Sequence, residues 1–159
     1  MNSFLVPFIA HRNEREKKDI MKVPIGLSYG RYKKYWGNMN EGKLSEIYSS
    51  VLFDLKKVNG VRMIALAGRD GYLFDENVNE GLETMTLMSS DMLRAAETVT
   101  NKLEKVNPNR VIVDYNGGKL ITVSAGSKAL ISVITTNDAR LDPIIKELER
   151  TAEKIKEIL

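Results

Sequence analysis

Three tight turns between short apolar runs constrain the fold of this chain more than any other feature. The turns Asp70-Gly71, Asn116-Gly117-Gly118 and Gly126-Ser127-Lys128 all contain glycine, which readily adopts the positive φ that short hairpin connections need. Strands joined by so few residues run antiparallel, whereas parallel strands need a crossover of about a dozen residues or more. The sequence therefore predicts a sheet built mainly from antiparallel hairpins.

The apolar runs beside these turns predict five strands, at residues 61–67, 72–75, 110–115, 119–124 and 129–135. Apolar residues spaced by three and four predict helices over about 44–58 and 83–105, and a last helix that runs to residue 159. We expect Asp142 to cap this last helix and Pro143 to be its first residue. The expected fold is an α/β three-layer α/β/α sandwich with a five-stranded antiparallel-type sheet, in the order α-β-β-α-β-β-β-α.

The helix over 83–105 has two distinct faces. Its apolar face is predicted to pack on the sheet and comprises Met85, Met88, Met92, Ala96, Val99 and Leu103. The opposite face is our candidate partner-binding surface and comprises Leu87, Ser90, Arg94, Glu97 and Asn101. The small residues Ser89, Ala95 and Ala96 would let a second helix approach closely.

The run 110–115 is expected to form an edge of the sheet. Its residues Val111, Ile112 and Val113 are apolar, and an uncovered apolar edge strand favours aggregation. Pairing with the same strand of a second copy removes that hazard, so Val111 and Val113 join Ser89, Ala95 and Ala96 as the candidate dimer interface. The alternative is that the N-terminal segment covers this edge.

The composition argues against an enzyme. The chain has no cysteine and only one histidine, His11, which lies outside the regular elements, so we predict no catalytic residue, no metal site and no cofactor. Gly118-Lys119 is followed by Leu120, and Val113 stands where a phosphate-binding loop has its first glycine, so no nucleotide site is expected. The lack of cysteine fits a cytoplasmic protein. The run 4–10 is too short to span a membrane and contains Pro7.

Residues 1–40 differ in composition from residues 41–159. They hold eight Lys/Arg and three Asp/Glu, and residues 29–36 alternate aromatic and basic side chains. Such a stretch can stack on single-stranded nucleic acid or lie at an anionic membrane, but we favour a disordered or loosely docked extension and regard nucleic acid as an unlikely partner. A further alternative is that translation starts at Met39, because the codons of Trp36 and Gly37 form a guanine run upstream of it.

Residues 41–159 resemble the roadblock (dynein light chain) family. The resemblance rests on Val58-Asn59-Gly60-Val61, on Arg69-Asp70-Gly71-Tyr72-Leu73, on the Asn-Gly-Gly hairpin and on residues 130–135. The chain departs from the family at Leu141-Asp142-Pro143, where a glycine often precedes the last helix.

The resemblance implies how the protein works. Roadblock domains pair by placing their long helices side by side and joining their third strands edge to edge, and the paired platform binds Ras-like small GTPases as a regulator or scaffold. The chain is thus expected to be a non-catalytic homodimeric GTPase partner. The alternative is a small-molecule sensor of profilin-like shape, which would need a cavity lined by convergent polar groups.

Overall fold

The computed structural model describes residues 41–74 and 80–159, with side chains from 49 and 81 onward in the two ranges. The predictions for residues 1–40, including His11 and the stretch 29–36, lie outside the described residues. The described elements follow in the order α4 (Glu41–Lys56), β1 (Val61–Gly68), α5 (Glu80–Glu104), β2 (Val111–Tyr115), β3 (Gly118–Ala125), β4 (Ala129–Thr136) and α6 (Leu141–Ile158).

The strands form one antiparallel sheet with the order β1-β4-β3-β2. The hairpins β2–β3 and β3–β4 follow the glycine turns that the sequence predicts, and β4 also pairs with β1. Strand β2 is therefore an edge strand, as expected.

The prediction of a fifth strand at residues 72–75 is wrong for the part that the structure describes. After the turn, Leu73 forms only an isolated bridge with Ala67. A strand requires repeated residue pairs along a ladder, and Leu73 supplies only one. The backbone N–H of the preceding residue, Tyr72, donates a hydrogen bond to the side chain of Asp70. Leu73 and Phe74 are both buried, one in the cluster on each side of the sheet. The segment thus contributes to the core without extending the sheet, which has four strands in the described residues.

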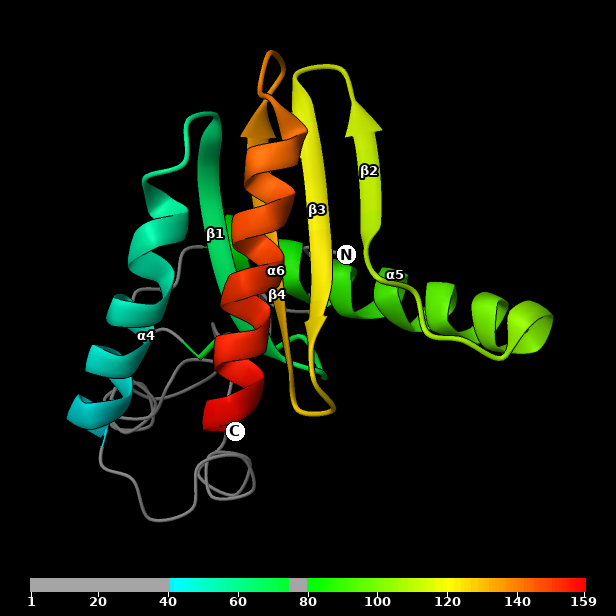
Figure 1. Ribbon diagram of the computed structural model, residues 1–159, viewed down its shortest axis with the longest axis horizontal. Coiled ribbons are helices and arrows are strands. Elements are labelled where there is room, and N and C mark those ends of the chain that lie inside the picture. The colour runs from blue at the N-terminus through cyan, green and yellow to red at the C-terminus, as the bar shows by residue number, and fades with distance from the viewer. Residues whose placement is uncertain (1–40, 75–79) are drawn as a thin grey trace, which may run out of the picture.

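The helices cover both faces of the sheet, so the predicted three layers are present (Figure 1). Helices α4 and α6 lie on one face, where the larger apolar cluster includes Leu55, Ile121, Ile131, Ile144 and Leu148. Among the described helices, α5 lies on the other face and crosses the strands. Its C-terminal half extends past the edge strand β2 (Figure 1).

The layer between α5 and the sheet is small and partly polar. Thr86 and Ser89 of α5 are fully buried there. The hydroxyl groups of Thr122 and Ser132, on the sheet, form a hydrogen bond of 2.9 Å. The Oγ atom of Ser89 has no hydrogen-bond partner among the described residues. Leu93 is the large α5 side chain that is completely buried in this layer, against Ala67 and Leu130.

The predicted cap of α6 is not observed. The N-cap residue is Arg140, whose backbone is extended and whose side chain makes no capping hydrogen bond. Asp142 lies inside the first turn, because the helix begins at Leu141. A carboxylate at that position faces the positive end of the helix dipole but does not bond the free N–H groups as a cap does.

Candidate functional site

Helix α5 is rotated relative to the orientation that its apolar pattern predicts. Of the six residues expected to pack on the sheet, only Met85 is buried, whereas the side chains of Val99 and Leu103 are 55% and 74% exposed. The positions that face the sheet are Thr86, Ser89 and Leu93. At about 100° per residue, this difference corresponds to roughly a quarter of a turn about the helix axis. The predicted core face is therefore largely a surface.

This surface is a continuous apolar band along one flank of α5, here called the apolar stripe. It comprises Met88, Met92, Ala96, Val99 and Leu103, which are half-buried near the sheet and exposed beyond it. Ala95 is exposed beside the stripe. The stripe therefore grows more exposed toward the end of α5 that extends past β2.

A second apolar feature, here called the apolar row, crosses all four strands on the side of the sheet that α5 occupies. Its members Met63, Ile134, Leu120 and Val113 are neighbours in register and are all half-buried. Leu120 and Ile134 pack with Met85, which lies on the same flank of α5 as the stripe. The stripe and the row thus form one partly uncovered apolar surface.

The edge strand β2 adds to this surface. It pairs only with β3 among the described strands, and Tyr115, on the same face of the strand as Val111 and Val113, is 40% exposed. The candidate interface residues Val111 and Val113 are half-buried along it. Ser89 does not belong to this interface, because its side chain is fully buried against the sheet.

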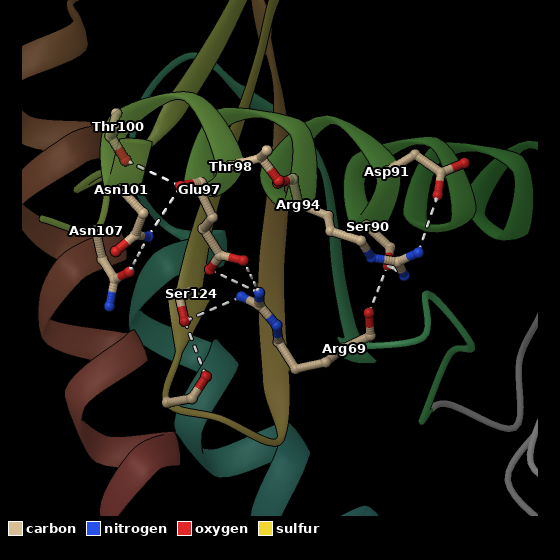
Figure 2. Close-up of polar contacts among 11 residues, drawn as sticks. Arg69, Ser90, Asp91, Arg94, Glu97, Thr98, Thr100, Asn101, Asn107 and Ser124 are labelled. Carbon is tan, nitrogen blue, oxygen red and sulfur yellow. Dashed lines mark hydrogen bonds and ion pairs between the residues drawn. The ribbon is translucent and has the colours of Figure 1, made fainter. Parts of the chain in front are cut away.

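The predicted partner-binding residues do not all share one face. Arg94 and Asn101 are exposed and Leu87 is half-buried, but Ser90 is 3% exposed and donates a hydrogen bond to the carbonyl oxygen of Arg69. Glu97 turns toward the sheet and accepts hydrogen bonds from Arg69 (Figure 2). The quarter-turn rotation explains both corrections, since it moves Ser90 and Glu97 inward. Leu87, Arg94 and Asn101 remain as an accessible set.

Arg69, which no sequence pattern marks as a site residue, joins α5 to one end of the sheet. Its Nη2 lies 2.6 Å from each carboxylate oxygen of Glu97, and its Nη1 donates to Ser124 Oγ at 3.2 Å. Its backbone N–H donates to the carbonyl of Lys128 in the β3–β4 hairpin. We call Arg69, Ser90, Glu97 and Ser124 the Arg69 bracket (Figure 2). The sequence signal was weak, because an arginine before an Asp-Gly turn is usually a solvated turn residue.

The described residues include charged side chains, but not in an arrangement that could hold a metal ion. They contain no group of three or more His, Asp or Glu side chains arranged to hold a metal ion. Several carboxylates are paired with bases on the surface, as in Arg110–Glu149 and Arg150–Asp54. None of the helices within the described ranges has the length and hydrophobicity needed to span a bilayer.

Comparison with known proteins identifies the architecture. Residues 48–135 match the sequence profile of the Roadblock/LC7 domain. The fold is similar to a structure of MglB with a tetrameric arrangement, with a TM-score of 0.65 and 19% identity over 72% of this chain and 89% of that one. It is also similar to the gliding protein MglB of Thermus thermophilus, with a TM-score of 0.64 and 18% identity over 72% and 90% of the two chains.

A third similar structure is a Roadblock/LC7 domain from Streptomyces avermitilis, with a TM-score of 0.63 and 14% identity over 69% of this chain and 94% of that one. No curated protein matches the sequence. At these identities the similarity to solved structures establishes the fold.

Proposed function

Because the chain belongs to the Roadblock/LC7 domain family, we propose that it is a non-catalytic, homodimeric binding partner of a Ras-like small GTPase in the cytoplasm. The observation that carries the proposal is the exposed apolar stripe of α5 beside an edge strand that pairs on one side only among the described strands. A single copy leaves this surface partly open to water, and a contiguous apolar patch usually marks a protein interface.

The dimensions of α5 support a dimer. A helix of 25 residues is about 37 Å long at 1.5 Å per residue. Four strands spaced by about 4.8 Å make a sheet only about 15–20 Å wide. The helix crosses the strands (Figure 1), so its C-terminal half has no described sheet of its own chain to cover.

A second copy supplies what is missing. If β2 of one copy pairs with β2 of the other, the sheet continues under the projecting end of α5, and the unpaired backbone groups of the edge are satisfied. Val99 and Leu103 would then lie above the partner's apolar row, and the α5 helices would run side by side with Ala95 and Ala96 at their closest approach.

The accessible set Leu87, Arg94 and Asn101 is the proposed contact for the GTPase. Arg94 is 65% exposed, and its contacts with described side chains are long, at 3.9 Å to Asp91 and 3.4 Å to Ser90, so it can turn toward a partner. Asn101 is oriented by a hydrogen bond to Asn107. We expect these residues to bind without entering the nucleotide site, in line with the family resemblance.

The dimer is tested by placing charge on the stripe. Leu103 is already largely exposed in one copy, so Leu103→Glu should leave the fold intact, while burying the carboxylate in a dimer is unfavourable. We expect the dimer dissociation constant to rise by at least about tenfold in sedimentation equilibrium. Phe53→Glu is the matched control, because Phe53 is an exposed apolar residue of α4. A wild type that stays monomeric at tens of micromolar would refute the dimer.

The GTPase contact is tested by titration calorimetry with a purified Ras-like small GTPase in its GDP and GTP states. Changing Leu87 and Arg94 together to alanine should weaken binding by about tenfold or more. Arg94→Ala alone should lower any effect on hydrolysis only as far as it lowers binding. Arg150→Ala, on α6, is the control. Failure of the wild type to bind either state, together with tight binding of a metabolite, would favour the sensor alternative.

A further inference from the structure

The rotation of α5 is not the one that its hydrophobicity favours. A helix on a sheet normally buries its most apolar face, yet here Ser and Thr face the sheet while two methionines, a valine and a leucine stay at least partly exposed. Some interaction must therefore hold the helix in this rotation within a single copy.

The Arg69 bracket is that interaction. It binds α5 at two points separated by about two turns, through Ser90 and through Glu97, on the flank opposite the apolar stripe. The Arg69 and Glu97 side chains are only 22% and 24% exposed. Removing either charge would leave the other half-buried without its partner, which is more costly than losing an exposed ion pair.

The layer beneath α5 contains few large side chains from the helix itself. Met85 and Leu93 are the large α5 side chains buried in it, whereas Thr86 and Ser89, like Thr122 and Ser132 of the sheet, are small. The unpaired Oγ of Ser89 gains no hydrogen bond from the described residues in its present position. Without the bracket, rolling the stripe toward the sheet would bury Met88 and Met92, which are now only half-buried, more completely.

We propose that Arg69 is a positioning residue that fixes the rotation of α5 and so keeps the apolar stripe on the surface for a second copy of this chain. The inference rests on the proposed dimer. Loss of the bracket lets α5 roll toward its own sheet. The roll hides Met88 and Met92 within one copy, turns Val99 and Leu103 away from the partner, and weakens dimerisation.

The roll can be followed with single introduced thiols, because the chain has no cysteine of its own. Thr86→Cys places a thiol where the side chain is fully buried, on the part of the buried face farthest from the stripe, which the roll would uncover. Adding Glu97→Gln should raise its labelling rate by an aromatic disulfide reagent at least about tenfold, the scale of losing a charged hydrogen bond. Ala152→Cys, on the buried face of α6, is the control. Its thiol should stay protected from the reagent with or without Glu97→Gln.

Equal labelling of the thiols introduced at positions 86 and 152 would indicate general unfolding and would overturn the roll. Continued protection of the thiol at position 86 would overturn it as well. The second measurement is the dimer dissociation constant of the full chain, which Glu97→Gln and Arg69→Met should each raise by about tenfold. The exchanged pair Arg69→Glu with Glu97→Arg should recover part of that loss. Arg150→Met, which removes an ion-paired arginine from α6, should leave the dimer dissociation constant unchanged.

A wild type that dimerises no more tightly than its bracket variants would refute the positioning role while leaving the proposed function intact. A wild type that does not dimerise at all would instead refute the dimer, whatever the labelling shows. Labelling and sedimentation therefore separate the two failures.

Discussion

Gly71 lies where the turn after β1 comes closest to α5. Its φ is +86°, in the region that side chains rarely adopt, and an added Cβ would lie 2.8 Å from Leu87 Cα. The atoms that it would meet belong mainly to the α5 backbone, which cannot move aside as the end of a flexible side chain can. This contact places the turn, and with it Arg69, directly against the helix.

We therefore expect Gly71→Ala to lower the free energy of unfolding by about 2–4 kcal/mol, from backbone strain together with the steric clash. Gly117→Ala is the matched control, since Gly117 also has a positive φ of +125° but its Cβ would meet nothing closer than 3.8 Å. Urea denaturation of both variants would measure the difference. If both variants lost the same free energy of unfolding, the close contact between Gly71 and α5 would contribute nothing to the cost of Gly71→Ala.

At the scale of elements, α6 is strongly amphipathic but begins without a side-chain cap. It buries Ile144, Leu148 and Ile155 against the sheet. Its N-cap residue, Arg140, is exposed and has the extended backbone that a capping residue adopts, with φ −78° and ψ 116°. Packing therefore stabilises this helix while the N–H groups of its first turn lack a side-chain acceptor at the cap position.

Arg140→Asp should raise the free energy of unfolding by about 0.5–1.5 kcal/mol, because a carboxylate at the cap accepts a backbone hydrogen bond and faces the positive end of the helix dipole. Asp142→Asn is the comparison, and it should cost only a few tenths of a kcal/mol since Asp142 is not the cap. Thermal or urea unfolding would test both. No gain from Arg140→Asp would mean that the first turn is already satisfied.

At the scale of the whole molecule, α5 makes the single copy asymmetric. Within the described ranges, α4 and α6 cover one face of the sheet, whereas α5 covers the other and extends beyond it (Figure 1). The apolar stripe and row remain partly open as a result. Folding and association are then linked in the proposed dimer, because pairing protects apolar surface that the single copy leaves exposed.

This linkage predicts that the melting temperature of the wild type depends on concentration. Raising the protein concentration about 100-fold should raise it by several degrees, since association stabilises the native state in proportion to the logarithm of concentration. Differential scanning calorimetry would measure the shift. The Leu103→Glu variant should show no such dependence of melting temperature on concentration. A wild type whose melting temperature does not change with concentration would contradict the linkage.

The sequence by itself determined the number of helices in the described region, the hairpins β2–β3 and β3–β4, the edge position of β2 and the family. These features depend on local patterns: helical and strand periodicities, and glycines such as Gly71 and Gly117 at positions of positive φ. Turn chemistry and periodicity act over a few residues, so they can be read from neighbours in the chain.

Only the tertiary structure decided the rotation of α5, the inward positions of Ser90 and Glu97, and the absence of a described strand after the Asp70-Gly71 turn. The contacts responsible join Arg69 to Glu97 and Ser124, which are 28 and 55 residues away in sequence. Hydrophobic periodicity predicts that the stripe of Met88, Met92 and Val99 is buried, but it does not tell whether the covering surface is the chain's own sheet or another molecule. That choice depends on ion pairs and close backbone contacts between distant segments, which no local pattern contains.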